Sequence, residues 1–167
     1  MQYARGTESL AIHPNRNSLI ESGAVQIATP FWQVVPLNKQ TILLADDHPS
    51  LPKIVAGLLE AAFEVVGQVG DGQALIEAAG ELKPDVIITD ISMPVRSGLE
   101  AANILKQAGC TSKIIFLTVH TDPDFIRACL DTGALGYVAK SHMATDLSRA
   151  IREVLAERVF VSPSLRY

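Results

Sequence analysis

From residue 40 onward, the chain alternates short apolar runs with longer stretches in which apolar residues recur every three or four positions. The apolar runs are typical of strands, and they cover residues 42–45, 64–69, 86–89, 113–118 and 136–140. The longer stretches are typical of helices with one buried face, at about 51–62, 72–82, 99–108, 122–133 and 144–157. Five strands alternating with five helices predict a parallel sheet with helices on both faces.

The first of these helices carries an apolar stripe that we expect to face the sheet. Its members recur at intervals of three and four, and they are Leu51, Ile54, Val55, Leu58 and Ala62. Pro49 and Pro52 fall before or within the first turn, where a missing N–H group is tolerated.

Residues 1–39 follow neither pattern. They mix Asn, Ser, Thr, Pro and Gly with scattered apolar residues and show no sustained period. Segments of this kind bury too little apolar surface to offset the entropy of ordering them. The sequence therefore predicts an N-terminal extension over residues 1–39 that is disordered or loosely docked, followed by one domain over residues 40–158.

Composition and charge narrow the classes of function. The 167 residues are 48% hydrophobic, which suits one domain with a sizeable core, and the net charge of -4 disfavours general attraction to nucleic acid or anionic membranes. Cys110 and Cys129 form no Cys-x-x-Cys motif and fit a reduced protein. No apolar run approaches the roughly 18 residues that a membrane span needs, and no signal peptide is recognisable. We expect a cytoplasmic protein with no membrane partner.

Polar residues follow four of the predicted strands at the point where each strand ends. Asp46 and Asp47 follow the first, Asp90 the third, Thr118 ends the fourth and Lys140 ends the fifth. The carboxyl ends of parallel strands meet at one edge of the sheet, where open α/β folds place their ligands. Acids before a helix are often only helix caps. Three acids converging from two strands instead favour a cation, and oxygen ligands favour Mg²⁺ or Mn²⁺ over Zn²⁺.

These residue types suit phosphoryl transfer onto a carboxylate. Lys140 can pair with a carboxylate or with phosphoryl oxygens, and the hydroxyl of Thr118 can donate a hydrogen bond to a phosphoryl oxygen. Together with Mg²⁺ they would stabilise in-line transfer to a nucleophile, for which Asp90 is placed. We interpret His48 and His120 as polar residues at the rim of the site.

Five stretches between about residues 40 and 162 form a combined motif: LLADDHP (43–49), DVIITDISMP (85–94), SGLEA (97–101), IFLT (115–118) and GYVAK (136–140). Together they resemble the receiver domain of bacterial two-component response regulators, in the NarL/FixJ-type branch. The resemblance implies a flavodoxin-like (βα)5 fold, a doubly wound parallel sheet with strand order 2-1-3-4-5.

The resemblance also implies a role for each residue that matches the motif. Asp90 would be the phospho-acceptor and would ligate Mg²⁺ directly together with Asp47. Asp46 would act on the metal largely through water, and the backbone carbonyl of Ser92 would be a further ligand.

Three more residues match the part of the family motif that responds to phosphorylation. Thr118 and Tyr137 match the switch pair, in which the hydroxyl moves toward the phosphoryl group and the aromatic ring turns inward. Lys140 matches the phosphate-binding lysine.

The resemblance predicts a phosphorelay protein that takes its phosphoryl group from a histidine kinase or phosphotransfer protein. The signal would alter the surface formed by residues 122–133, 136–140 and 144–157, with a homodimer formed on phosphorylation as one option. The protein would not be an enzyme beyond self-phosphorylation from a donor and slow self-dephosphorylation.

Several alternatives and limits accompany this prediction. Residues 159–167 resemble the start of a linker to a helix-turn-helix domain, so the chain could be the receiver half of a DNA-binding transcription regulator. Without that output domain, the chain alone should not bind DNA directly.

A flavodoxin-like FMN protein is a rival, but the acids 46 and 47 would repel the cofactor's phosphate without a metal. An aspartyl-phosphate hydrolase would need further acid/base groups, and the sequence offers none.

Overall fold

The computed structural model describes residues 39–120 and 122–165. The predicted extension over residues 1–39 lies outside the described residues except for Lys39. Within the described ranges, the helices are all too short or too polar to cross a membrane.

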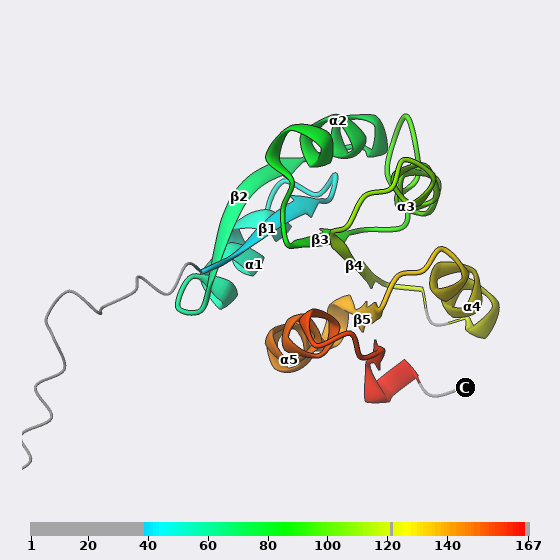
Figure 1. Cartoon of the computed structure of the whole chain (residues 1–167). Coiled ribbons are helices and arrows are strands. Elements are labelled where there is room, and N and C mark those ends of the chain that lie inside the picture. Colours follow the sequence, from blue (N-terminus) through cyan, green and yellow to red (C-terminus); the bar gives the residue numbers. More distant parts are fainter. Residues whose placement is uncertain (1–38, 121, 166–167) are drawn as a thin grey trace, which may run out of the picture. The chain divides into compact units, whose positions relative to one another are not determined.

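The core of the fold is a parallel sheet of six strands in the order β2-β1-β3-β4-β5-β6 (Figure 1). The strands are β1 (Gln40–Ala45), β2 (Phe63–Val69), β3 (Val86–Thr89), β4 (Lys113–Thr118), β5 (Gly136–Ala139) and β6 (Phe160–Val161). The predicted fold class is confirmed, and so is the order of the first five strands. The sixth strand was not predicted, because two apolar residues are too few to show a period.

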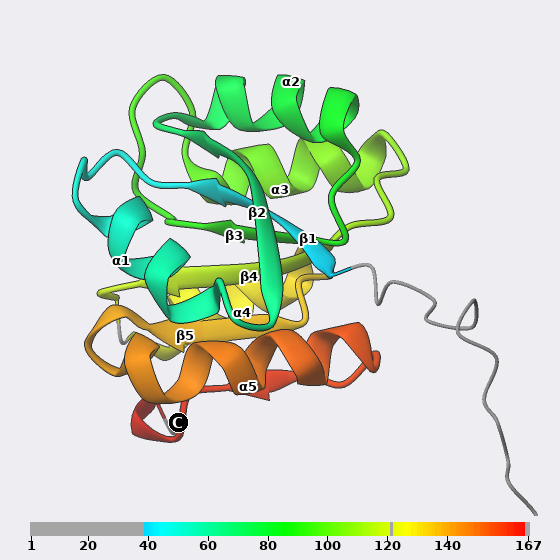
Figure 2. The ribbon, with the colours of Figure 1, turned by 90° about the vertical axis from the view of Figure 1, so that its left-hand side faces the viewer.

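Helices cover both faces of the sheet, as the alternating pattern predicted (Figures 1 and 2). They are α1 (Leu51–Leu59), α2 (Gly72–Leu82), α3 (Gly98–Gln107), α4 (Pro123–Asp131) and α5 (Met143–Leu155). Helices α1 and α5 pack on one face and form one apolar core with it, and α2, α3 and α4 form a second core on the other face. Single turns of 3-10 helix cover Lys140–His142 and Pro163–Leu165.

The helix boundaries follow from caps that the sequence supplies. The side chain of Asp71 accepts hydrogen bonds from the first amides of α2, and that of Asp122 caps α4. Helix α3 begins with a capping box, in which the Ser97 hydroxyl accepts from the Glu100 amide and the Glu100 carboxylate accepts from the Ser97 amide. These caps satisfy amide groups that have no partner inside the helix.

The predicted stripe on α1 is wrong in part. Val55 and Leu59 are buried against the sheet, whereas Ile54 is 49% exposed and Leu58 is 39% exposed. The helix also ends at Leu59, before Ala62. Each residue of an α-helix is rotated by about 100° from the one before it. Ile54 and Leu58, one position before the buried pair, are therefore turned away from the sheet.

The loop between β3 and α3 contains a strained backbone position. Val95 has a φ angle of 64° and is 81% exposed. A residue with a Cβ is destabilised by about 1–2 kcal/mol in the left-handed region, a cost that glycine avoids. Glycine in turn lowers stability by about 0.5–1 kcal/mol, because its unfolded chain has more conformational freedom to lose. We therefore expect Val95→Gly to raise the free energy of unfolding by about 0.5–1 kcal/mol in urea titrations. Val159, which is 59% exposed without a positive φ, is the control, and Val159→Gly should lower stability. Equal effects of the two substitutions would contradict the strain.

Candidate functional site

The parallel register brings the four predicted strand ends to one edge of the sheet. Ala45 pairs with Thr89, and Thr118 pairs with Ala139, so the residues that follow β1 and β3, and those at the ends of β4 and β5, lie near one another. The Asp90 amide donates to the carbonyl of Ala45 at 2.8 Å, which carries the β1–β3 pairing one residue past the strand. The acids that follow β1 and β3 are thereby held side by side.

Lys140 bridges two buried carboxylates at this edge. Its Nζ lies 2.6 Å from Asp46 Oδ2 and 2.7 Å from Asp90 Oδ2, and the exposed fractions of the three side chains are 12%, 4% and 6%. Burial lowers the pKa of Lys140, but its contacts with Asp46 and Asp90 raise it by more, so the net shift is upward. The lysine is therefore a charged ammonium that offsets the repulsion between the two acids.

Asp90 is held at both its backbone and its side chain. Its Oδ1 accepts a hydrogen bond from the Ile91 amide at 2.6 Å, and its carbonyl accepts one from the buried hydroxyl of Thr89 at 2.9 Å. A Cβ at position 98 would lie 1.9 Å from the Asp90 carbonyl oxygen, so this close approach of α3 requires Gly98. These contacts leave the carboxylate little freedom to turn away from the site.

Two exposed residues, Asp47 and His48, lie beside the buried acids Asp46 and Asp90 and form one cluster with them. Asp46, Asp47, His48 and Asp90 each offer a ligand atom, and these four atoms lie within 4.8 Å of one another. His48 Nδ1 lies 3.1 Å from Asp47 Oδ1, and the His48 amide donates to Asp46 Oδ1 at 2.8 Å. His48 thus belongs to the cluster rather than only to its rim. Its position next to Asp47 was the signal in the sequence.

The cluster fits a hard divalent cation. Asp46 Oδ2 is buried and accepts no hydrogen bond of good geometry from the described residues, although the distance to Lys140 makes an ion pair. The Lys140 ammonium offsets the cost of burying this oxygen, so the fit to a metal depends on the ligand atoms gathered within 4.8 Å of one another. The carboxylate oxygens match the ligands that Mg²⁺ prefers.

Thr118 and Tyr137 are both fully buried, and His120 connects them. Thr118 Oγ1 accepts a hydrogen bond from the His120 amide at 3.1 Å, and the Tyr137 hydroxyl donates to the His120 carbonyl at 3.0 Å. Burial raises the pKa of Tyr137, so its phenol is neutral and donates the bond. Both side chains of the expected switch pair therefore form hydrogen bonds with the backbone of His120, just after β4.

His120 also joins the acid site to α4. Its Nε2 lies 3.0 Å from Ser92 Oγ, and its ring stacks on Phe125 with the ring centroids 4.8 Å apart. No local pattern indicated the contact with Ser92, because Ser92 lies 28 residues before His120 in the chain. To the interpretation of His120 as a polar residue at the rim, the structure adds its contacts with Ser92 and Phe125.

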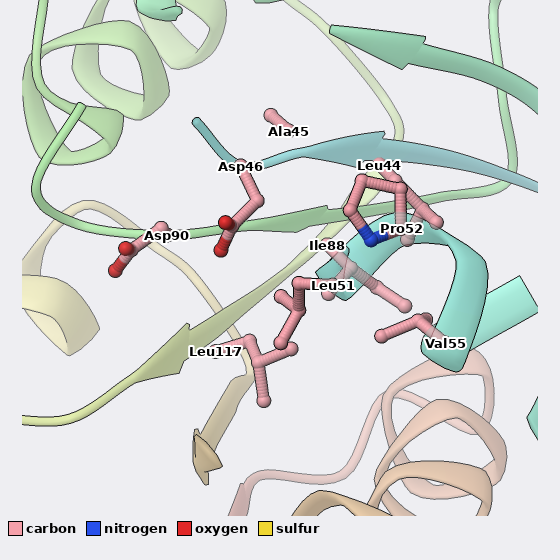
Figure 3. A pocket seen from close by; sticks show the side chains of 9 residues that line it. All are labelled: Leu44, Ala45, Asp46, Leu51, Pro52, Val55, Ile88, Asp90 and Leu117. Carbon is pink, nitrogen blue, oxygen red and sulfur yellow. The ribbon is translucent and has the colours of Figure 1, made fainter. Parts of the chain in front are cut away.

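Two hollows adjoin the acids. Figure 3 shows the carboxylates of Asp46 and Asp90 at the ends of β1 and β3, beside apolar side chains that include Leu51 and Leu117. The cavity among these side chains measures about 10 Å³, which is space for one water molecule at most. A second, open pocket of about 320 Å³ is lined by Asp47, His48, Ser50, Leu51, Asp90, Ser92, Val119 and Lys140. This open pocket is large enough to admit a phosphoryl group to Asp90.

Comparison with known proteins gives one consistent match. Residues 42–152 match the model of the family described as response regulator receiver domain. The uncharacterized transcriptional regulatory protein YvfU of Bacillus subtilis is 40% identical over 129 residues, which are 75% of this chain and 64% of that protein. The nitrate/nitrite response regulator protein NarP of Escherichia coli is 38% identical over 140 residues, 79% of this chain and 61% of that protein. The chain thus spans less than two thirds of the length of these relatives.

Solved structures give the same match. A two-component response regulator of the LuxR family from Aurantimonas superposes with a TM-score of 0.73 at 30% identity, covering 76% of this chain and 92% of that chain. The isolated REC domain of RcsB from Salmonella enterica serovar Typhimurium, in the presence of the phosphomimetic BeF3-, gives a TM-score of 0.71 at 32% identity. This match covers 77% of this chain and 96% of that chain.

Proposed function

Because the chain belongs to the response regulator receiver domain family, in its NarL/FixJ-type branch, we propose that Asp90 accepts a phosphoryl group in a Mg²⁺-dependent reaction. The donor would be a histidine kinase or a phosphotransfer protein. The observation that carries this proposal is the buried Asp90 carboxylate, held by Lys140 and its own loop beside an acidic cluster and an open pocket.

Four residues would hold the metal. Asp47 and Asp90 would bind Mg²⁺ through their carboxylates and Ser92 through its backbone carbonyl, while Asp46 would act through water. When bound, the ion supplies positive charge that neutralises the acids and the incoming phosphoryl oxygens. His48 lies in the same cluster and contacts Asp47.

The remaining residues act on the phosphoryl group itself. A carboxylate oxygen of Asp90 forms a bond to phosphorus as the bond from phosphorus to the donor breaks, and the electron pair of that bond leaves with the donor. Lys140 would shift from the two carboxylates to the phosphoryl oxygens, because its flexible stem carries a compact charge. Thr118 accepts a bond from His120 but has a hydroxyl proton of its own to donate to the new group.

The signal would leave through α4, β5 and α5, since Thr118 and Tyr137 share the segment between β4 and α4. YvfU is a transcriptional regulatory protein and NarP a nitrate/nitrite response regulator, and both extend beyond the region of similarity. We therefore propose that the phosphorylated receiver regulates transcription through a helix-turn-helix DNA-binding domain. A homodimer formed on phosphorylation is one way in which it would do so.

The test is intact mass after incubation with Mg²⁺ and a small phosphodonor. We expect a gain of one phosphoryl group that disappears when a chelator is present. Asp47→Ala should also prevent the gain, because it removes a metal ligand. Asp131→Ala, which removes an exposed acid at the end of α4, should label like the wild type. Normal labelling of Asp47→Ala would place the metal elsewhere.

A further inference from the structure

Residues 160–165, which we call the C-terminal strap, complete the sheet at the free edge of β5 (Figure 1). Strand β6 pairs in parallel with β5, with Phe160 beside Gly136 and Val161 beside Tyr137. The Phe160 amide donates to the Leu135 carbonyl at 2.8 Å, and the Ser162 amide donates to the Tyr137 carbonyl at 2.9 Å. The strap is therefore bonded to the backbone of the strand that carries the expected switch tyrosine.

The hydroxyl of Ser162 fastens the strap to two other elements. Ser162 is 1% exposed, and its Oγ donates to Asp146 Oδ2 at 2.6 Å and accepts from the Ala139 amide at 3.2 Å. Asp146 lies in the first turn of α5, and Ala139 directly precedes Lys140. One buried hydroxyl thus joins β6 to α5 and to the residue before the phosphate-binding lysine.

The strap contributes to the cores on both faces of the sheet. Phe160 is buried in the core formed with α1 and α5. Leu165 is 3% exposed and belongs to the other core, which also contains Tyr137 and Ile126 of α4. Tyr137 and Leu165 therefore belong to one packed core, through which a movement of the Tyr137 ring would displace other side chains.

The contacts of Tyr137 depend in turn on Thr118. The Tyr137 hydroxyl donates to the carbonyl of His120, and the amide of His120 is held by Thr118 Oγ1. A shift of the Thr118 hydroxyl toward a phosphoryl group would lengthen its bond with the His120 amide and so displace the carbonyl to which Tyr137 donates. Hydrogen bonds thus connect Thr118 through His120 to Tyr137, whose carbonyl accepts from the Ser162 amide of the strap.

We propose that the C-terminal strap is a conformational sensor, which docks firmly on β5 when Asp90 is unmodified and loosens when it carries a phosphoryl group. This inference rests on the proposed function, because the signal begins at Asp90. The residues that follow the strap would then be released from the sheet edge. The coupling is reciprocal, so loosening the strap should also favour the phosphoryl-bound state.

Amide hydrogen exchange measured by NMR on the full chain tests the proposal, with Mg²⁺ present and with or without beryllofluoride as a phosphoryl mimic. The Phe160 and Ser162 amides should exchange about fivefold faster or more when the mimic is bound, the lower end of typical coupling free energies. Intact mass with the phosphodonor is measured in parallel. A protein that gains the phosphoryl group but shows unchanged or slower exchange in the strap overturns the sensor and leaves the proposed function intact. Absence of the mass gain overturns both.

Variants of the buried contact provide the second test. Ser162→Ala and Asp146→Ala each remove one side of the same hydrogen bond, so each should speed exchange in the strap without the mimic and tighten mimic binding. The double variant should add little to Ser162→Ala, because that substitution already removes both the bond to Asp146 and the bond from the Ala139 amide. Ser164→Ala, at an exposed position of the strap, is the matched control and should behave like the wild type. Wild-type mimic affinity in a Ser162→Ala protein with a loosened strap would overturn the coupling. Melting curves show whether each variant folds. If Ser162→Ala does not fold, the strap exchange and mimic affinity of Asp146→Ala test the coupling.

Discussion

Asp90→Asn should gain no phosphoryl group under conditions in which the wild-type chain gains one. The amide is almost the same size as the carboxylate and can still accept the hydrogen bond from the Ile91 amide. It is, however, a very poor nucleophile toward phosphorus, and it contributes no negative charge to a metal. Intact mass after incubation with Mg²⁺ and a small phosphodonor measures the result.

Two controls show whether the loss of phosphoryl labelling is caused by the missing nucleophile. The Asp90→Asn protein should retain its fold, as judged by circular dichroism, because the Asp90 backbone contacts with Ala45 and Thr89 remain. Asp131→Asn, a matched change at an exposed acid, should label normally. Robust labelling of Asp90→Asn at another residue would refute the assignment.

Lys140→Ala should destabilise the metal-free protein by about 2–3 kcal/mol. Removing one partner of a buried ion pair leaves uncompensated charge and typically costs 3–5 kcal/mol. We expect a smaller value because the site borders the open pocket, from which water can reach the acids. Urea unfolding in the presence of a chelator measures the change in the free energy of unfolding.

Mg²⁺ should recover most of this loss, because the ion can take over the neutralisation of the acids. Lys113→Ala is the control. It removes an ion pair with Glu157 that is 28% exposed on the lysine side and 68% on the glutamate side. Exposed pairs contribute about 0–1 kcal/mol, so this change should be small and insensitive to Mg²⁺. Equal losses for the two lysine variants, with no recovery by Mg²⁺, would refute the role given to Lys140.

The same ion pair predicts the direction of a dependence on alkaline pH. The pKa of Lys140 is raised above its ordinary value of 10.5, as contacts with Asp46 and Asp90 outweigh burial. A raised pKa in the folded state means that the ammonium contributes its full stability below the unfolded-state pKa. That contribution is lost as the pH rises through the higher folded-state pKa. Wild-type stability should therefore fall above about pH 10.5 in a way that Lys140→Ala does not reproduce.

The pattern along the chain determined the fold class and most of the site. Apolar runs and helical periods are local properties, and together they predicted the alternating elements and the parallel sheet that the structure confirms. The family was predicted from the five motif stretches and is also confirmed. The positions of Asp46, Asp90, Thr118 and Lys140 followed without knowledge of packing. The reason is geometric, since strands that run in parallel must end at the same edge of their sheet.

Tertiary structure alone decided which side chains meet across that edge and which face of each helix is buried. Ile54 and Val55 are adjacent apolar residues, and their apolar character alone predicts burial for both. Only the rotation of α1 against the sheet buries Val55 and exposes Ile54. Phe160 and Val161 become a strand because β5 offers a free edge beside them. His120 likewise bonds with Ser92 and Tyr137 because the loop after β3, the loop after β4 and strand β5 converge there. Such contacts join residues far apart in the chain, so no local period records them.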